Sequence, residues 1–188
     1  MENASPHCVL VTGGAGYIGS HAALELLRSG HRVIIVDTLE RGSRDVIQKL
    51  EGLGALSFVE ADCGDQDRMK AILPEVDCIM HFAAYANVLE SIEAPDRYQH
   101  NNVDATRSLL DAAVQVGVDK FIMSSTCAIY GNPSIELMPV SEDCPLDPLS
   151  PYGDTKVQAE NLVSEAATHA GLSAGVLRFF NVIGADAS

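Results

Sequence analysis

The sequence predicts an α/β fold with an open, doubly wound parallel sheet, and three observations support this prediction. Six short apolar segments alternate with segments of helical periodicity along the 188 residues, as they do in successive βαβ units. The apolar segments are continuous and do not alternate with polar residues, which indicates strands buried on both faces. No repeat, low-complexity tract or long linker divides the sequence, so we expect residues 1–188 to form a single domain.

The expected strands are short apolar runs at regular intervals. The first is CVLVT at residues 8–12, and the second, HRVIIVD at residues 31–37, contains four consecutive β-branched residues, which favour strands. The other four runs read LSFVEAD, VDCIMHF, DKFIMSS and AGVLRFF, at residues 56–62, 76–82, 119–125 and 174–180.

The expected helices lie between these strands, at residues 17–29, 43–51, 66–73, 97–116 and 151–170. Their apolar residues recur at helical spacing and predict one buried face for each of the longer helices. Gly30, Gly117 and Gly171 follow three of them, at the position where glycine commonly ends a helix. Residues 132–151 are rich in proline and are expected to form one extended loop.

The composition argues against several classes of protein. A hydrophobic content of 47% is typical of a globular chain, and a net charge of −14 disfavours nucleic-acid and anionic-membrane surfaces, which need basic patches. The sequence contains no apolar run long enough to span a membrane and no signal-peptide pattern in MENASPHC at its start. Its five cysteines are scattered without a CxxC pair, and its six histidines are dispersed, so we expect a reduced, cytoplasmic protein without a metal site.

A glycine-rich turn follows the first expected strand. It reads TGGAGYIGSH at residues 12–21, with Gly13, Gly16 and Gly19 spaced as GxxGxxG. Such a turn lets the backbone approach a pyrophosphate, and the helix after it offers unpaired N–H groups and the positive end of its dipole. The strand before the turn and the helix after it make a dinucleotide site the favoured interpretation.

An acidic residue ends the second expected strand. Asp37 follows Gly19 by 18 residues, close to the spacing expected for a carboxylate that binds the adenosine ribose and repels a 2′-phosphate. Asp37 therefore predicts NAD in preference to NADP. Arg41 and Arg44 follow closely and weaken this preference, unless they are simply solvated.

The stretch SPYGDTK at residues 150–156 suggests a reactive pair of side chains. Ser150 and Pro151 are suited to the N-cap and the first position of a helix. Tyr152 and Lys156 would then share one helix face, and an ammonium near a phenol favours the phenolate by lowering its pKa. A surface tyrosine and a surface lysine at helical spacing is the alternative.

Together these stretches resemble the UDP-galactose (UDP-glucose) 4-epimerases of the extended short-chain dehydrogenase/reductase superfamily. The resemblance runs from about residue 8 to 186, and its most specific stretches are HFAAYANVLES and SSTCAIYG; SPYGDTK, NNVDAT and LRFFNVIGA add to it. It implies a Rossmann-like cofactor domain that binds NAD and a UDP-sugar substrate.

The resemblance also implies individual roles. Tyr152 would be the catalytic base, Lys156 its helper and a ligand of the nicotinamide ribose, and Thr126 the partner of the C4 hydroxyl. The cofactor would lie against Gly13, Gly16, Tyr17, Ile18 and Gly19 at the pyrophosphate, Asp37 and Thr38 at the ribose, Asp62 and Cys63 at the adenine, and Phe82, Ala83, Ala84, Asn101 and Phe180 elsewhere. Asn181, Thr126 and Tyr152 would contact the substrate. C4 would be inverted through a transient 4-keto sugar, and helices 97–116 and 151–170 could form a homodimer.

Several residues keep simpler interpretations. Thr126 could merely cap the end of its strand, and His81 is expected to be a core histidine. Cys127, next to Thr126, has no evident His–Asp partner and is expected to be a small buried residue. Ala105 and Phe179 depart from the family pattern, at the positions of a glycine and a tyrosine.

Three functions stay open at this stage. Family members continue past the position of Ser188 into a smaller substrate-binding region, so the chain is expected to be an epimerase without most of that region, or an NAD-binding module without turnover. A 4-epimerase acting on another UDP-sugar is the third possibility. A dehydratase is disfavoured because Cys127 and Ala128 stand where dehydratases carry an acidic pair.

Overall fold

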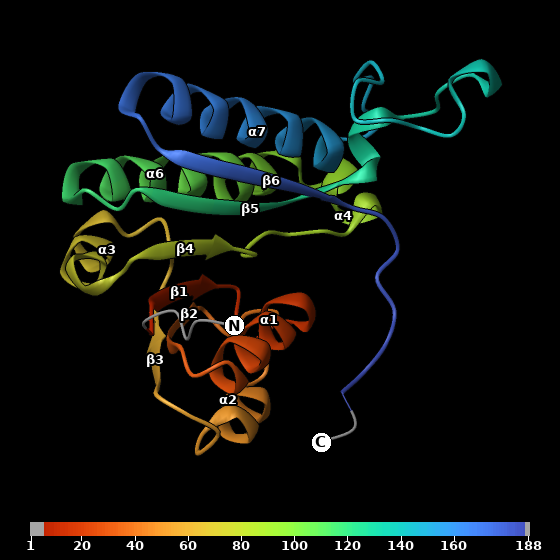
Figure 1. Cartoon of the computed structure of the whole chain (residues 1–188). Helices are drawn as coiled ribbons and strands as arrows, with labels where there is room; N and C mark the ends of the chain where they lie inside the picture. Colours follow the sequence, from red (N-terminus) through yellow and green to blue (C-terminus); the bar gives the residue numbers. More distant parts are fainter. Residues whose placement is uncertain (1–5, 187–188) are drawn as a thin grey trace.

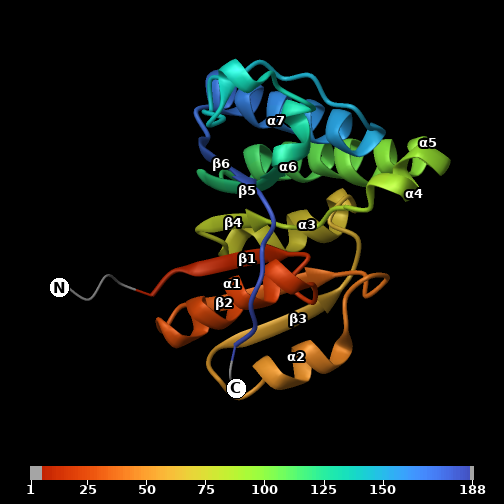
Figure 2. The same ribbon diagram turned by 90° about the vertical axis from the view of Figure 1, so that its right-hand side faces the viewer.

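The computed structural model describes residues 6–186 and contains a parallel six-stranded sheet with helices on both faces (Figures 1 and 2). The strands lie in the order β3-β2-β1-β4-β5-β6. Strand order reverses between β1 and β4, and ligands of open α/β sheets bind at such a reversal, outside the carboxyl ends of the strands. The strand bounds are Cys8–Thr12 (β1), Arg32–Asp37 (β2), Leu56–Glu60 (β3), Cys78–His81 (β4), Lys120–Thr126 (β5) and Ser173–Phe179 (β6).

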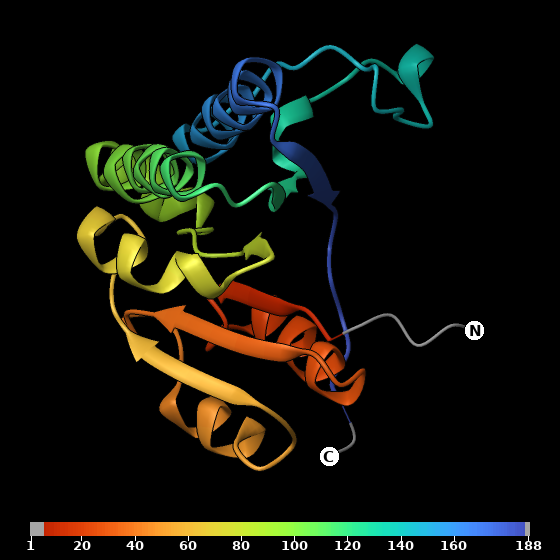
Figure 3. The same ribbon diagram turned by 60° about the vertical axis from the view of Figure 1, so that its left-hand side comes forward.

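The helices form one layer on each face of the sheet (Figure 3). Helices α1 and α2 cover β1–β3 on one face, while α3, α6 and α7 cover the other. Two short helices, α4 and α5, follow β4. The bounds are Tyr17–Arg28 (α1), Arg44–Leu50 (α2), Gln66–Ile72 (α3), Val88–Glu93 (α4), Pro95–Tyr98 (α5), Ala105–Val116 (α6) and Pro151–Ala170 (α7).

The central strands are buried on both faces, as their continuous apolar runs predicted. Leu10 and Ile34 pack with α3, α6 and α7, whereas the neighbouring Val11 and Ile35 pack with α1 and α2. Each of these side chains is at most 5% exposed, and burying one stabilises the fold by about 1.5–3 kcal/mol relative to exposure. The doubly wound α/β prediction is therefore confirmed.

Helix α7 begins and ends at the residues that the sequence indicated. The Ser150 hydroxyl accepts a hydrogen bond of 3.1 Å from the Gly153 N–H, Pro151 occupies the first turn, and Gly171 follows the helix with a φ of 70°. This cap fixes where the first turn of α7 starts, and hence where Tyr152 is placed.

The expected helix at residues 97–116 is wrong in its first turns. Pro95–Tyr98 is a short α-helix, Gln99–Asp104 forms a π-helical turn, and α6 starts only at Ala105. The wider turn accompanies a buried Asn102, whose amide oxygen accepts from the Tyr85 N–H at 2.8 Å and whose amide nitrogen donates to the Tyr85 carbonyl at 3.0 Å. Side-chain hydrogen bonds thus compensate for the interrupted α-helical pattern.

Several short elements were not expected from the sequence, among them the 3-10 turns Leu73–Glu75 and Cys127–Tyr130. Helix α4 is capped by Asn87, which accepts from the Glu90 N–H at 3.1 Å. Within the proline-rich loop, Ile135–Leu137 forms a single 3-10 turn. In the described part of the chain, none of the helices has the length and hydropathy needed to cross a membrane.

The segment after β6 crosses back over α1 (Figure 3). The Tyr17 hydroxyl donates to the Gly184 carbonyl at 2.7 Å, and Arg28 forms an ion pair with Asp186 at 2.8 Å. These contacts place residues 184 and 186 beside a helix that is more than 150 positions earlier in the sequence.

Candidate functional site

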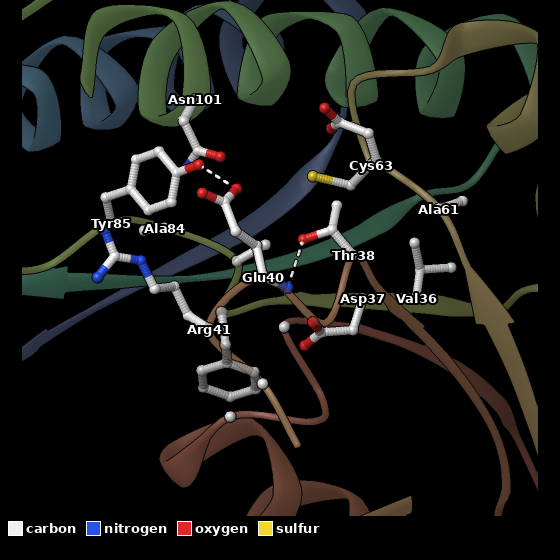
Figure 4. A pocket seen from close by; sticks show the side chains of 16 residues that line it. Val36, Asp37, Thr38, Glu40, Arg41, Ala61, Cys63, Ala84, Tyr85 and Asn101 are labelled. Carbon is white, nitrogen blue, oxygen red and sulfur yellow. Dashed lines mark hydrogen bonds between the residues drawn. The ribbon is translucent and has the colours of Figure 1, made fainter. Parts of the chain in front are cut away.

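A pocket opens at the carboxyl ends of the first four strands, at the reversal of strand order (Figure 4). Its lining comes from the glycine turn, the ends of β2, β3 and β4 with the residues that follow them, and the π-helical turn. The lining residues are Gly13, Gly16, Val36, Asp37, Thr38, Glu40, Arg41, Gly42, Ala61, Asp62, Cys63, Phe82, Ala83, Ala84, Tyr85 and Asn101.

The glycine turn is too tight for side chains at several positions, and at Gly13 and Gly19 the obstacle is the backbone. Gly13 has a φ of 69°, and a Cβ there would lie 2.6 Å from the Ala83 nitrogen. A Cβ at Gly19 would lie 2.3 Å from the Gly13 carbonyl oxygen. The N-cap of α1 is Gly16, and no side chain caps this helix or places an acid in its first turn. The first N–H groups of α1 are therefore left for an anion.

Asp37 holds the turn after β2 in place. One carboxylate oxygen accepts from the Ala15 N–H at 3.0 Å and the other from the Leu39 N–H at 2.8 Å. Leu39 has a φ of 60°, an uncommon conformation for leucine, and the Asp37 bond closes the turn around it. Each carboxylate oxygen retains lone-pair capacity, and Asp37 lines the pocket.

Three pocket residues that were not assigned from the sequence lie at the pocket mouth. Glu40, Arg41 and Tyr85 come from the segments after β2 and β4, and Figure 4 shows the Tyr85 hydroxyl pointing to the Glu40 carboxylate. The Arg41 guanidinium lies 5.3 Å from the centre of the Tyr85 ring. The sequence signal that could have indicated these three residues is their position, a few residues after the ends of β2 and β4.

A second cluster lies where β5 ends and α7 begins. The Thr126 hydroxyl accepts from the Ala128 N–H at 3.2 Å, so it does cap the turn after its strand. It also acts as a hydrogen-bond partner of the Tyr152 side chain. Lys156, one helical turn beyond Tyr152, is 3% exposed. The sequence spacing thus brings a phenol, a hydroxyl and an amine to one end of the sheet.

The ionisation of Tyr152 and Lys156 is controlled mainly by burial. Burial raises the pKa of Tyr152, and the hydrogen bond from Thr126 only partly opposes this rise. The direction is opposite to the one that the spacing to Lys156 predicted, because burial of the phenol is the largest influence and Lys156 is not among the groups that shift this pKa. Burial also lowers the pKa of Lys156 to about 8, and the charge of Glu160 partly counteracts it.

His81 is a core histidine, as expected. Its Nδ1 lies 2.7 Å from the Thr12 hydroxyl and its Nε2 lies 2.9 Å from the Thr106 hydroxyl. Burial lowers its pKa to about 3, so the ring is neutral near pH 7. Both ring nitrogens are therefore satisfied inside the protein.

The structure brings together many, but not all, of the residues predicted for the cofactor. Those in the pocket lining are Gly13, Gly16, Asp37, Thr38, Asp62, Cys63, Phe82, Ala83, Ala84 and Asn101. Those outside it are Tyr17, Ile18, Gly19, Tyr152, Lys156 and Phe180. Phe180 is 62% exposed and Asn181 is also exposed, in the segment that leaves β6. Cys127 is a free, partly buried thiol.

Comparisons with known proteins agree on one family. The "NAD dependent epimerase/dehydratase family" matches residues 9–188. UDP-arabinose 4-epimerase 1 of Arabidopsis thaliana is 46% identical over 184 residues, which cover 95% of this chain and 43% of the relative. UDP-glucose 4-epimerase of Azospirillum brasilense is 41% identical over 185 residues, covering 97% of this chain and 51% of the relative.

A solved structure resembles the fold closely. UDP-glucose-4-epimerase from Stenotrophomonas maltophila, with bound NAD and formylated UDP-arabinopyranose, matches with a TM-score of 0.91 and 41% identity. The match covers 96% of this chain and 55% of that one. The chain thus spans about half the length of the relatives that it matches.

Proposed function

Because the chain belongs to the NAD dependent epimerase/dehydratase family, we propose that it inverts C4 of UDP-galactose and UDP-glucose with NAD as cofactor. One observation carries this proposal. Tyr152 and Lys156 lie one turn apart at the start of α7, and Tyr152 is a hydrogen-bond partner of Thr126 at the carboxyl end of β5, while a pocket opens at the carboxyl ends of β1, β2 and β4. A hydroxyl acceptor, a proton-transferring phenol and a dinucleotide cradle are the parts that the reaction needs.

The pocket fits NAD on the evidence of its own geometry. The backbone at Gly13 lies so close to Ala83 that a Cβ would collide there, and α1 starts without a capping side chain. A pyrophosphate can therefore lie against the turn and the N-terminus of this helix. Asp37, at the end of β2, can accept from the hydroxyls of the adenosine ribose. Thr38, Asp62, Cys63, Phe82, Ala83, Ala84 and Asn101 would complete this contact surface.

The proposed proton chemistry rests on Tyr152. Burial raises the pKa of Tyr152, so the positive nicotinamide ring and Lys156 would have to favour its phenolate; that phenolate would take the proton of the C4 hydroxyl and return it after inversion, while the Thr126 hydroxyl holds the sugar oxygen in line. When bound, NAD supplies a reversible hydride acceptor for C4 and a positively charged ring. Lys156, still largely cationic at pH 7 with a pKa of about 8, would hold the nicotinamide ribose.

The remaining predicted contacts are proposed with the same site. Tyr17, Ile18 and Gly19 form the first turn of α1, where their N–H groups would face the pyrophosphate. Phe180 and Asn181 follow β6, next in the sheet to the strand that carries Thr126, so they would meet the nicotinamide and the substrate diphosphate.

A second candidate substrate is UDP-arabinose. A UDP-arabinose 4-epimerase is 46% identical to this chain, and a UDP-glucose 4-epimerase is 41% identical. Both reactions invert C4, so Tyr152 and Thr126 would have the same roles in each. The contacts around C5 of the sugar would then decide which of the two substrates is used. An NAD-binding module without turnover is the non-catalytic alternative.

Other properties of the chain are proposals of the same standing. We propose that residues 1–188 form one cofactor-binding domain. A homodimer would use the groove between α6 and α7, which Leu110, Val114, Leu162 and Ala166 line. The cytoplasm is the proposed location, supported by five free cysteines in the described chain.

The experiment is a sugar conversion assay with a matched variant. The purified chain and its Tyr152→Phe variant are incubated with NAD and either UDP-galactose or UDP-arabinose, and the anomeric signals are followed by NMR. Conversion by the wild type alone supports epimerisation, and the faster sugar identifies the substrate. No conversion, with NAD still bound in calorimetry, would favour the cofactor-binding module. Equal conversion by both proteins would remove Tyr152 from the mechanism.

A further inference from the structure

Two arginines lie close to the Tyr85 ring, which lines the pocket together with Arg41. Arg41, which follows β2, lies 5.3 Å from the centre of the Tyr85 ring, and Arg97 of α5 lies 4.6 Å from it. Arg41 lines the pocket together with Asp37. Guanidinium groups at this position would attract a 2′-phosphate on the adenosine ribose, since arginine binds phosphate oxygens in pairs.

Each of the two guanidinium groups forms an ion pair with a nearby carboxylate. Glu90 of α4 pairs with Arg41 and, at 2.9 Å, with Arg97. Glu40 pairs with Arg97 and also accepts a hydrogen bond from the Tyr85 hydroxyl. That hydroxyl, with the nearby arginines, holds the pKa of Glu40 below its usual value. Two carboxylates thus pair with the two arginines before Asp37 is counted.

We propose that Glu40 and Glu90 determine cofactor choice, by neutralising Arg41 and Arg97 so that the site accepts NAD and rejects NADP. This inference rests on the proposed binding of NAD and adds residues to it. Asp37 repels a 2′-phosphate directly, whereas Glu40 and Glu90 act on the cations that could otherwise bind one. The pairing also explains how a site with an arginine in its lining can still favour NAD.

Glu90 is partly buried and lies beside Tyr98, so its ion pair with Arg41 forms next to the pocket. The Tyr98 hydroxyl has a single proton, which it shares between the Asn87 carbonyl at 2.7 Å and the Glu90 carboxylate at 3.2 Å. The Glu90 side chain is 22% exposed, less than the 52% of Arg41. Glu90 is therefore the less exposed member of this ion pair, and Arg41 is the more exposed one.

The chain contains a matched control for this arrangement. Arg44 pairs with Glu60, and Arg32 pairs with Glu75. None of these four residues lines the pocket. The double variant Glu60→Gln/Glu75→Gln therefore changes the net charge by the same amount as Glu40→Gln/Glu90→Gln and also frees two arginines, but away from the mouth.

The experiment measures the dissociation constants of NAD and NADP by calorimetry, with both cofactors titrated into each preparation. The quantity compared is the ratio of the NADP constant to the NAD constant, because an inactive fraction affects both alike. We expect Glu40→Gln/Glu90→Gln to lower this ratio at least about tenfold, the scale of a charge-assisted arginine–phosphate contact. Adding Arg41→Ala to the double variant should restore most of the ratio, and raising the salt concentration should reduce the gain.

The outcomes separate this inference from the function beneath it. A ratio that changes no more than in Glu60→Gln/Glu75→Gln would overturn the assignment of Glu40 and Glu90, while leaving NAD binding intact. A lowered ratio that survives Arg41→Ala would also overturn it, because the freed arginine would then not be the cause. Absence of NAD binding in the wild type would overturn the proposed function itself, and this inference with it.

Discussion

Replacing Lys156 with methionine should stabilise the cofactor-free chain near neutral pH. The lysine is 3% exposed, and its pKa falls from 10.5 to about 8 because burial disfavours the ammonium. The native state therefore binds fewer protons than the unfolded state between about pH 8 and pH 10.5, so stability rises with pH across that window. Below it, both states are protonated and the full cost of the buried charge remains.

The size of the gain follows from the shift in pKa. The difference between a pKa of 10.5 in the unfolded chain and about 8 in the native chain, at about 1.36 kcal/mol per pH unit, gives a cost of about 3 kcal/mol at pH 7. Methionine keeps the apolar stem and removes this cost. At pH 9.5 much of the native lysine is already neutral, so the advantage of Lys156→Met should shrink to about 1.5 kcal/mol.

The assay is urea unfolding of both proteins without cofactor, followed by circular dichroism at pH 7 and pH 9.5. Lys49→Met, at an exposed position on α2, serves as the control and should change stability by no more than about 0.5 kcal/mol. A variant less stable than the wild type at pH 7, or a difference that does not depend on pH, would refute the claim that a desolvated ammonium destabilises this fold. The same variant should lose any epimerase activity.

Three further predictions follow from packing, pairing and exposure. Gly19→Ala should destabilise the fold by at least about 2 kcal/mol in thermal unfolding, since its Cβ would lie 2.3 Å from the Gly13 carbonyl oxygen, whereas Gly175→Ala meets no atom within 4 Å and should be near neutral. Arg178→Met should cost about 3 kcal/mol in urea unfolding, because Glu160, whose carboxylate Arg178 binds at 2.8 Å, would be left buried and unpaired; a loss below 1 kcal/mol would contradict this. The chain should self-associate through its exposed apolar side chains, which sedimentation would detect. A chain that stays monomeric at high concentration would contradict this prediction. The most exposed large apolar side chains are Leu89, Ile135, Leu149, Phe180 and Ile183.

The features that could be predicted from sequence are those set by local rules. Burial of the central strands follows from continuous apolar runs, and the start of α7 follows from Ser150 and Pro151. The same prediction is wrong for β3 and β6, which are the edge strands of the sheet and are only partly buried. The pocket at Gly13 and Asp37 follows from a motif whose spacing predicts a tight turn after β1 and a carboxylate at the end of β2. These rules need no knowledge of distant contacts.

The features that could not be predicted depend on residues far apart in sequence. The π-helical turn forms around hydrogen bonds between Asn102 and Tyr85, 17 positions away, which no helical periodicity reveals. Glu40 meets Arg97 across 57 positions, because β2 and β4 flank the same strand of the sheet. The pKa of Tyr152 also depends on burial, which a four-residue spacing to Lys156 cannot indicate.

The buried polar residues between the two parts of the site have a defined direction of hydrogen bonding. The Thr106 hydroxyl donates its single proton to the Asn102 carbonyl at 2.7 Å, so toward His81 it must accept. His81 therefore carries its proton on Nε2, and its neutral Nδ1 accepts from the Thr12 hydroxyl. Burial, together with the charge of Lys156, lowers the pKa of this ring to about 3, so the neutral form is the one present near pH 7.

The same chain of hydrogen bonds continues to α7. Asn102 uses both amide protons, one to the Tyr85 carbonyl at 3.0 Å and one to the Thr155 hydroxyl at 3.2 Å. Thr155 then donates to the Tyr152 carbonyl at 2.8 Å. Each donor has one acceptor, so the turn that follows β1 and the first turn of α7 are tied without a buried charge. The backbone of the first turn of α7, which carries Tyr152, is thereby fixed relative to the end of β1, as the proposed reaction between a bound cofactor and a bound sugar would require.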